Sequence, residues 1–391
     1  MHESGWRAGA RDLKGNKLMR QVPMSLPDID ANDIEFVVQA IESKRLSMGP
    51  FLERFEHSFA DYLGVGHAIA VSSGTAALHL CMRAANIGPG DEVITTPFSF
   101  VASSNCILYE RATPVFVDVD EQSMNINPDL AESAVTERTR AVLPVHVFGQ
   151  ACELDRIGSL CRKHDLLLIE DACEALGTEF RGRKVGTFGK AAAFGFYPNK
   201  QITMGEGGVI STDDADWAVM LRSLRNQGRK EMGTWLQHEH LGFNYRLDEM
   251  SAALGLSQLA RIEDLLNRRN AAAGIYRELI RAIPGITILS PVETTTRLSW
   301  FVLIIRLNEA IARDEVIDYL RNSGIPTRTY FSPIHLQPFY KEKFGFREGD
   351  FPIAERLAKS VLALPFHSNI STADIEYVAT CLQAAVERCF V

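Results

Sequence analysis

Residues 67–85 read HAIAVSSGTAALHLCMRAA, and this stretch contains one complete strand–turn–helix unit. The apolar run HAIAVS is typical of a buried strand, Ser72 to Thr75 form a turn of small residues, and the remainder has the composition of a helix. Such a turn directs the free N–H groups and the positive dipole end of a helix towards one point, which makes an anion site. Serine and threonine also cap helices without binding a ligand, so this stretch alone leaves both interpretations open.

Similar apolar runs recur through the first half of the chain. They are bounded by Gly, Pro or Asp and mostly alternate with helix-length segments, which predicts a largely parallel sheet covered by helices on both faces. Helical spacing also precedes the first run, at residues 30–45 and 50–64. The further runs are DEVITT (91–96), TPVFVDV (113–119), AVLPVHV (141–147), LLLIED (166–171) and AAAFGF (191–196).

A long helical pattern divides the rest of the chain. It begins near Leu247 and ends at Pro284, and strands such as WFVLIIRL (300–307) then alternate with helices. We therefore predict an α/β protein with a large domain, a linking helical stretch and a smaller C-terminal α+β domain. The first residues are polar and basic without the apolar segment of a secretory signal, so we expect a loose extension there. The predicted bounds are 1–22 for the extension, 23–245 for the large domain, 246–284 for the helical stretch and 285–391 for the small domain.

The composition narrows the class of protein. Hydrophobic residues make up 46% and charged residues 23% of the 391, which are ordinary globular values. A formal charge of −8 argues against nucleic-acid or anionic-membrane partners, and no apolar run is long enough to predict a membrane span. The seven cysteines are scattered without a C-x-x-C pair, so we expect neither a disulfide framework nor a metal site. Because cysteines without a disulfide framework are typical of a reducing compartment, we expect a cytoplasmic protein.

Chemically useful side chains follow three of the runs, at the strand ends where open α/β sheets bind ligands. Phe98 and Phe100 follow DEVITT, Asp171 ends LLLIED, and Lys200 follows AAAFGF just before the glycines of NKQITMGEGG (199–208). Singly, each has a structural explanation, because aromatics pack in cores, acids cap turns and most lysines are solvated. Together with the anion-binding turn, they match the four parts that pyridoxal 5'-phosphate (PLP) requires: a phosphate cradle, a stacking ring, an acid for the pyridine nitrogen and a lysine.

Six motifs of the chain, in the same order, resemble those of the DegT/DnrJ/StrS family of sugar aminotransferases. The resemblance covers the chain from about residue 30 to its end and implies the fold-type-I aminotransferase fold with PLP as cofactor. It implies that Lys200 carries the cofactor covalently and that Gly74 and Thr75 bind its phosphate. It also implies that Phe100 stacks on the cofactor ring and that Asp171 keeps the pyridine nitrogen protonated. The motifs are AVSSGTAALHL (70–80), GPGDEVITTPFSFVASSN (88–105), ATPVFVDVD (112–120), LIEDACEALG (168–177), FGFYPNKQITMGEGG (194–208) and HLGFNYRLDEMSAALG (240–255).

The resemblance adds expectations at four other positions. Glu174 occupies a place near the cofactor where relatives often have His or Gln. Relatives commonly have a phosphate-binding serine where this chain has Gly195, five residues before the lysine, so the phosphate must depend more on the other ligands. In the family, the GFNYRLDE loop enters the neighbouring subunit's site. Asn244 is therefore a candidate phosphate ligand in a homodimer with shared sites, and Arg246 either holds a donor carboxylate or forms a surface ion pair.

The resemblance also suggests the substrates. The amino donor is expected to be glutamate, and the acceptor a nucleotide-linked 4-keto-6-deoxyhexose that is aminated at C4, with C3 as the nearest alternative. The segments RLSMGP (45–50) and TYFSPIHLQPFY (329–340) resemble segments that border the sugar site. The candidate substrate residues in these segments are Ser47, Tyr330, Phe331 and His335, although each could equally serve in packing.

Three other functions remain open from the sequence. A sibling branch of the family removes a sugar hydroxyl at C3 with histidine in place of the lysine, and Lys200 argues against it. Another fold-type-I aminotransferase, acting on a cyclitol ketone or an amino acid, can be separated only by a panel of substrates. A sensor that binds PLP without turnover would be expected to carry a DNA-binding module, and no such motif is visible.

Overall fold

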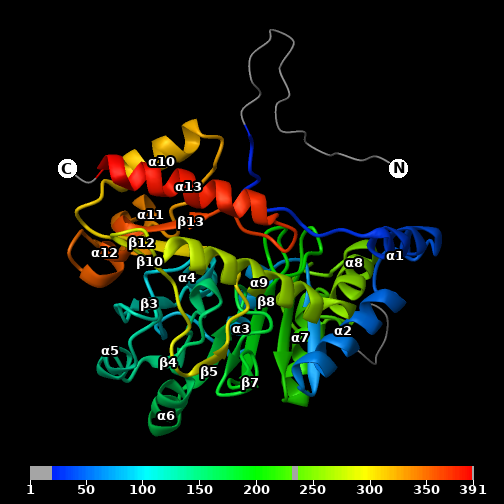
Figure 1. The fold of residues 1–391 in the computed structure, drawn as a ribbon. Coiled ribbons are helices and arrows are strands. Elements are labelled where there is room, and N and C mark those ends of the chain that lie inside the picture. Colours follow the sequence, from blue (N-terminus) through cyan, green and yellow to red (C-terminus); the bar gives the residue numbers. More distant parts are fainter. Residues whose placement is uncertain (1–19, 231–236, 390–391) are drawn as a thin grey trace.

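The computed structural model describes residues 20–230 and 237–389, so residues 1–19 of the expected extension lie outside the described residues. A seven-stranded sheet forms the centre of the larger part of the molecule (Figure 1). Its strands are β1 (His67–Val71), β2 (Glu92–Thr95), β3 (Thr113–Phe116), β4 (Thr139–Val142), β5 (Leu167–Asp171), β8 (Ala191–Gly195) and β9 (Gly208–Thr212).

The sheet has the order β1-β9-β8-β5-β4-β2-β3. The pairs from β8 to β3 are parallel, whereas β9 runs antiparallel to both β1 and β8. The predicted largely parallel sheet is therefore confirmed. The apolar runs did not indicate β9, whose sequence GVIST contains only two large apolar residues.

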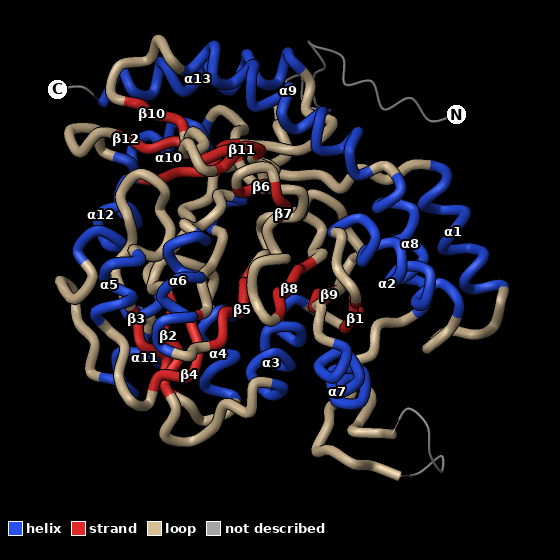
Figure 2. The backbone as a smooth tube through the Cα atoms, turned by 90° about the horizontal axis from the view of Figure 1, so that it is seen from below, coloured by secondary structure: helices blue, strands red, loops and turns tan. Residues whose placement is uncertain are grey.

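Helices cover both faces of this sheet (Figure 2). Successive strand residues point to opposite sides, so Ala68 and Ala70 of β1 join one buried cluster while Ile69 and Val71 join another. Helices α2 (Pro50–Leu63), α6 (Leu154–His164) and α8 (Glu249–Ala260) pack in the first cluster with α5 (Pro128–Ser133). Helices α3 (Gly74–Ala84), α4 (Ala102–Tyr109) and α7 (Ala215–Arg225) pack in the second.

The helical pattern predicted after residue 247 forms two helices. Helix α8 ends at Ala260 and α9 (Ile262–Ile280) begins after Arg261, whose φ of −118° and ψ of 19° lie outside the helical range. The Arg261 guanidinium donates hydrogen bonds to the carboxylates of Asp28 (2.8 Å) and Asp33 (2.7 Å). The break therefore places a cation against the N-terminal segment and helix α1 (Ala31–Glu42), which packs on α8. Periodicity alone could not show it, because the apolar spacing continues on either side.

Residues 285–389 form a smaller α+β part around its own buried cluster. Strands β10 (Ile286–Ile288), β12 (Leu303–Leu307) and β13 (Val361–Leu364) make an antiparallel sheet, which α9, α10 (Arg313–Asn322) and α13 (Thr372–Cys389) cover. Val22, at the end of the predicted extension, is buried here and donates its N–H to the Gly324 carbonyl (3.1 Å). Other elements here are α11 (Pro338–Phe344), α12 (Pro352–Ser360), the turn η2 (Ile334–Leu336) and β11 (Thr295–Arg297), which pairs with β6 (Glu179–Phe180) and through it β7 (Arg183–Lys184).

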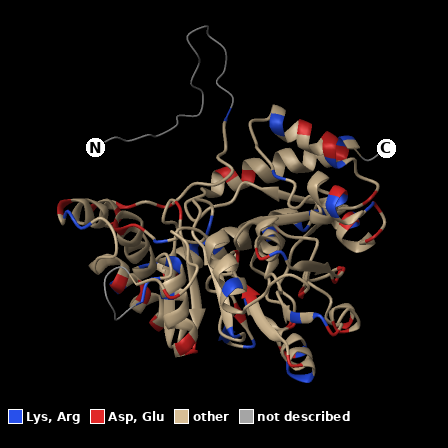
Figure 3. Cartoon of the chain, turned by 180° about the vertical axis from the view of Figure 1, so that it is seen from behind, with Lys and Arg blue, Asp and Glu red and all other residues tan. Residues whose placement is uncertain are grey.

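Charged residues of both signs are interspersed over the elements of the molecule (Figure 3). Among the described residues, no helix has the length and apolar character needed to cross a membrane.

Candidate active site

The turn between β1 and α3 forms the first part of the site. Ser73 caps the helix, since its hydroxyl accepts the N–H of Ala76 (3.1 Å), and the first N–H groups of α3 have no acceptors within the helix. Gly74 starts the helix at a crowded point, where an added Cβ would lie 3.0 Å from Cys173 Sγ and 3.2 Å from Gly195 Cα. The structure therefore brings the predicted anion turn, Gly74 and Thr75, against the end of β8.

Glycine at position 208 permits this arrangement. A Cβ on Gly208 would lie 2.3 Å from the Ser73 carbonyl oxygen and 2.8 Å from the Gly74 nitrogen, closer than any side chain allows. At Gly195, by contrast, an added Cβ would lie 3.6 Å from its nearest neighbours, Cys173 and Gly74, which is ordinary contact. Of the glycines after Lys200, Gly208 thus lets the β9 backbone approach the turn, whereas Gly195 is not sterically required.

Asp171 is buried at the carboxyl end of β5. Its carboxylate accepts hydrogen bonds from the Ser103 hydroxyl (2.7 Å) and the Cys173 amide (3.1 Å), and its carbonyl accepts the His146 N–H (3.0 Å). Burial raises the pKa of the Cys173 thiol well above its usual range, and the nearby Asp171 carboxylate raises it further. Asp171 is therefore a carboxylate with a fixed orientation, and neither hydrogen-bond donor to it is a cation.

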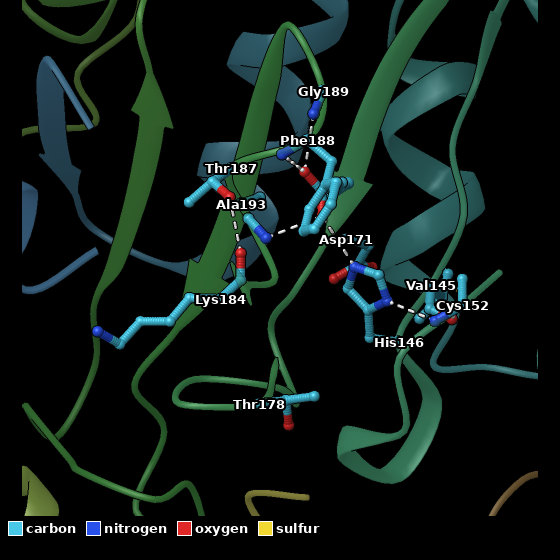
Figure 4. Close-up of polar contacts among 12 residues, drawn as sticks. Val145, His146, Cys152, Asp171, Thr178, Lys184, Thr187, Phe188, Gly189 and Ala193 are labelled. Atoms are coloured by element: carbon cyan, nitrogen blue, oxygen red, sulfur yellow. Dashed lines mark hydrogen bonds and ion pairs between the residues drawn. The ribbon is translucent and has the colours of Figure 1, made fainter. Parts of the chain in front are cut away.

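A second acid, Glu170, is buried in β5 directly before Asp171, and so points to the opposite face of the sheet. Figure 4 shows His146, Phe188 and Gly189, which lie around this part of β5. The Glu170 carboxylate accepts the N–H groups of Gly186 (2.8 Å), Phe188 (2.7 Å) and Gly189 (2.9 Å), and lies 3.1 Å from His146 Nε2. His146 Nδ1 accepts a hydrogen bond from the Cys152 N–H (3.1 Å). Nε2 therefore carries the ring proton and donates a hydrogen bond to Glu170. Burial alone would raise the pKa of Glu170, but these hydrogen bonds hold it below its usual value.

Lys200 lies in the loop after β8, with its side chain only 14% exposed. Its Nζ is 3.8 Å from Glu174 Oε1 and 3.9 Å from the centre of the Phe301 ring. The other Glu174 oxygen accepts the Phe148 N–H (2.8 Å). Burial raises the pKa of Glu174, and the Lys200 charge and the Phe148 amide oppose that rise. The structure therefore brings together the predicted Lys200 and Glu174, with an aromatic face beneath the amine.

Tyr330 and Phe331 extend this aromatic surface. Phe331 stacks on Phe148 with ring centres 5.4 Å apart and planes 5° apart, and Tyr330 lies 6.5 Å from both Phe148 and Phe301. Burial raises the pKa of Tyr330, and the Glu174 carboxylate adds to that rise. Both predicted residues thus lie beside Lys200's neighbours.

Phe100 borders a cavity of about 840 Å³ between α4 and the segment 331–343. Phe100 is 61% exposed, in contrast to the fully buried Phe98. The other lining residues include Ser99, Asn105, Tyr109, Phe331, Phe339, Tyr340 and Lys343.

The segments 45–50 and 243–249 lie side by side. Ser47 is exposed and pairs through its backbone with Asp248, while the buried Glu249 carboxylate accepts the Gly49 N–H (2.9 Å). Asn244 is exposed, and Arg246 donates to the side-chain oxygen of Asn226 (3.0 Å) rather than to a carboxylate. These three predicted residues form a group on the surface, close to the β1 end through the Arg246–Val71 bridge.

For His335 the sequence left both a contact with the sugar and a packing role open. Its side chain is fully buried, with Nε2 3.0 Å from Glu355 Oε1 and its ring packed on Phe351 and Phe346. The structure therefore gives His335 a packing role beneath the segment that carries Tyr330 and Phe331.

Several residues at the site were not predicted. Ser103 lies three positions after Phe100, a spacing that places both near the start of one helix and could have indicated it. Phe301 belongs to an apolar run that indicated only a strand. Arg269, whose guanidinium donates to the Lys200 carbonyl (3.0 Å), belongs to a helix with two other arginines. No local pattern distinguishes those two residues, because their contacts join distant parts of the chain.

Comparisons with known proteins agree with this geometry. The model of the DegT/DnrJ/EryC1/StrS aminotransferase family matches residues 27–383. GDP-perosamine synthase of Caulobacter vibrioides is 40% identical over 366 residues, covering 93% of this chain and 97% of that protein. Among solved structures, DesV of S. venezuelae has a TM-score of 0.88 at 36% identity, covering 94% of this chain and 99% of that one. Helicobacter pylori PseC, an aminotransferase of pseudoaminic acid biosynthesis, has a TM-score of 0.89 at 30% identity, covering 94% and 100%.

Proposed function

The chain belongs to the DegT/DnrJ/EryC1/StrS aminotransferase family, and from this premise we propose that it moves an amino group from glutamate to a nucleotide-linked 4-keto-6-deoxyhexose. The family consists of PLP-dependent sugar aminotransferases with the fold-type-I architecture, and this chain is one of them. We place the amination at C4, with C3 as the alternative. The observation that carries the proposal is the Lys200 amine held between Glu174 and the Phe301 ring, on the strand-end side of the sheet that also carries Asp171 and the α3 N-terminus.

The residues present fit the cofactor. The glycines at 74, 195 and 208 keep side chains away from the first N–H groups of α3, which suit a phosphate. We assign Asp171 to the pyridine nitrogen, because it is a buried carboxylate whose hydrogen-bond donors leave its charge unpaired. We assign the ring-stacking role to Phe100 and covalent attachment to Lys200. When bound, PLP supplies the carbonyl carbon that accepts the amino group and the conjugated ring that accepts the electron pair released with the proton.

The protein's own residues then handle the proton and exclude water. We propose that Lys200 Nζ takes the proton from Cα of the donor amino acid and, in the second half of the reaction, delivers a proton to C4 of the sugar. The Phe301 ring and the stacked Phe148 and Phe331 limit water around the amine. Glu174 lies close enough to hold the Lys200 ammonium in place between these transfers.

The cavity beside Phe100 supports a large acceptor. Its volume of about 840 Å³ lies in the range of pockets that take drug-sized or larger ligands. Aromatic rings such as those of Phe100, Tyr109 and Phe339 suit a nucleobase or sugar face, and Lys343 suits a diphosphate. A nucleotide would give the enzyme remote binding energy with which to orient a small ketone.

We also propose a homodimer with shared sites. Asn244 is exposed in one chain, as a ligand reserved for a partner's phosphate would be. Helix α1 supports the same proposal, because Ile34, Val38 and Ile41 form an exposed apolar stripe on it.

The substrate proposal is tested by comparing acceptors with glutamate as donor. A nucleotide-linked 4-keto-6-deoxyhexose, the same sugar without its nucleotide, and common 2-oxo acids are assayed separately, and the aminated carbon is identified by NMR. We expect the linked sugar to be the best acceptor and the free sugar to lose turnover as well as binding. If a 2-oxo acid is the best acceptor, or the free sugar reacts as well as the linked one, the chain is a general fold-type-I aminotransferase instead. Lys200→Ala, assayed in parallel, should be inactive with every acceptor.

A further inference from the structure

Arg269 is a buried arginine on α9 whose hydrogen bonds go to backbone carbonyls. Its Nη2 donates to the Lys200 oxygen (3.0 Å), and its Nη1 to the oxygens of Trp300 (3.1 Å) and Phe301 (3.3 Å). Among residues 20–230 and 237–389, no carboxylate lies within ion-pair distance of it. Burial lowers the pKa of Arg269 to about 10. Burying a charge without a counter-ion destabilises the folded protein, so we expect the Arg269 side chain to have a role that offsets this cost.

The preceding residue provides a contrast. Arg268 is partly exposed and pairs with Asp28 (2.7 Å) and Asp264 (2.8 Å), as a helix arginine ordinarily does. The two arginines are neighbours on one helix but have different surroundings. A requirement for positive charge on the surface of α9 therefore does not explain why Arg269 is a buried arginine.

The three carbonyls that Arg269 contacts belong to the parts of the chain that frame the Lys200 amine. One is on Lys200 itself, and the others are on the segment that presents the Phe301 ring 3.9 Å from Nζ. Gln201 joins the same two segments by donating to Ser299 Oγ (2.7 Å). A planar guanidinium with a fixed fork of donors is well suited to hold two backbone segments at a set distance.

Helix α9 contributes residues to both hydrophobic cores of the molecule. Residues Ile262 to Leu266 pack in the core beneath the large sheet, whereas Ala272 to Ile280 pack in the C-terminal core. Arg269 lies between the two sets, at the junction of the two cores. Its hydrogen bonds therefore tie the Lys200 loop of one part to the 300–301 segment of the other.

We propose that Arg269 is a positioning residue of the active site, which locks the Lys200 backbone to residues 300–301 and so holds the Lys200 amine over the Phe301 ring. The assignment rests on the proposed role of Lys200 as the cofactor lysine. Arg269 touches neither substrate nor reacting atoms; it acts through the position of Lys200.

The test uses the full chain with Arg269→Gln and Arg269→Lys, and with Arg268→Gln as the matched control. The apoproteins are treated with formaldehyde and cyanoborohydride at one pH, and peptide mass spectrometry gives the methylation rate of Lys200 relative to the exposed Lys359. Thermal unfolding and an absorbance titration with PLP are measured on the same samples. We expect Arg269→Gln to raise the relative Lys200 rate and to weaken PLP binding, each by about tenfold, because the amine leaves its place over the ring. Arg269→Lys should fall between, and Arg268→Gln should match the wild type.

The outcomes separate positioning from general stabilisation. If Arg269→Gln lowers the unfolding temperature but leaves the Lys200 rate and PLP affinity unchanged, the proposal is wrong. If Arg269→Gln does not fold, Arg269→Lys decides by the same two measurements. The cofactor role of Lys200 is checked independently by borohydride reduction of the wild-type holoprotein and peptide mapping. A label on another lysine would overturn that role, while the apoprotein methylation rates would still report on the Arg269 contacts.

Discussion

Asp171 is held in place by neutral donors, and this determines what its charge can do. The Ser103 hydroxyl and the Cys173 amide fix the direction of the carboxylate without neutralising it. No cation among the described residues forms an ion pair with Asp171, so its charge is available for the proposed pairing with the ring nitrogen of a bound cofactor. If Asp171 only capped the turn, the shape of its side chain would be sufficient for activity. If it pairs with the cofactor, activity would also require its charge.

Asp171→Asn should keep the fold and lose most of the transaminase activity. The amide keeps the size of the side chain but removes the charge. Removing one partner of a buried charge pair costs on the order of 3–5 kcal/mol, so we expect the rate to fall by much more than tenfold. Steady-state kinetics with a saturating PLP supply, together with thermal unfolding, measures both effects. Ser103→Ala, which leaves the charge but removes one donor, serves as the comparison. Near-normal turnover of Asp171→Asn would show that the acid only caps the turn.

Two glycines near the phosphate turn should respond oppositely to substitution. A side chain fits at Gly195, so Gly195→Ser should fold and tighten PLP binding by about fivefold, since one added hydrogen bond contributes about 1 kcal/mol. At Gly208 a Cβ collides with the Ser73–Gly74 peptide, so Gly208→Ala should destabilise the protein by about 1–3 kcal/mol and weaken PLP binding. Absorbance titration and chemical denaturation report the two quantities. If the affinity of Gly195→Ser for PLP equals that of the wild type, the phosphate does not bind at the end of β8 and the prediction is wrong.

Strand β5 carries two adjacent acids with separate roles. Asp171 faces the site, whereas Glu170 holds the 186–189 loop and His146 on the other face. Because His146 also donates its backbone N–H to the Asp171 carbonyl, the Glu170 cluster anchors the strand end from which Asp171 extends.

Glu170 should make the stability of the protein depend on acidic pH. Its pKa is lowered in the folded protein, so its contribution is fully present above the unfolded glutamate pKa of about 4.3 and is lost as the pH falls through the folded pKa. Glu170→Gln should lower the free energy of unfolding at pH 7 by on the order of 3–5 kcal/mol and flatten its decline in acid. Urea denaturation between pH 3 and pH 7, an interval that brackets that value, measures both. Glu348→Gln, which removes an exposed partner of Lys359, should change stability by less than about 1 kcal/mol; an equal effect would contradict the special role of Glu170.

The elements also show what the sequence could and could not predict. Apolar runs and turn residues located β1, β2, β5 and β8 and the anion turn before α3, because burial of a parallel strand leaves a local pattern. The break at Arg261 and the clusters around Glu170 and Arg269 left no such pattern. Each depends on contacts between residues that are far apart in the chain. In addition, the sequence does not show whether a single polar residue is exposed or buried. His335 illustrates this, since its motif left both a substrate contact and packing open, and only the structure shows that its side chain is fully buried.

Helix α1 carries an exposed apolar stripe on the surface of the molecule. Amphipathic helices normally turn such a stripe to the core, but Ile34, Val38 and Ile41 of α1 are 60%, 44% and 54% exposed. Buried Asp33 instead faces α8, where Gln258 and Arg261 donate to it. In the homodimer that we propose, the stripe is a candidate for the contact with the second copy.

Mixing two inactive variants tests whether the sites are shared. If Asn244 binds the partner's phosphate, each site needs Lys200 from one chain and Asn244 from the other, so Lys200→Ala and Asn244→Asp homodimers should both be inactive or severely impaired. Their heterodimer should regain one working site, and random pairing of equal amounts should restore about a quarter of the wild-type activity. The variants are co-expressed with different tags, the heterodimer is purified, and its activity and bound PLP are measured. The matched control pairs Asn244→Asp with a Lys200→Ala/Asn244→Asp double variant, a combination in which no site has both residues. A heterodimer no more active than this control, or a fully active monomer at assay concentration, would place Asn244 outside the partner's site.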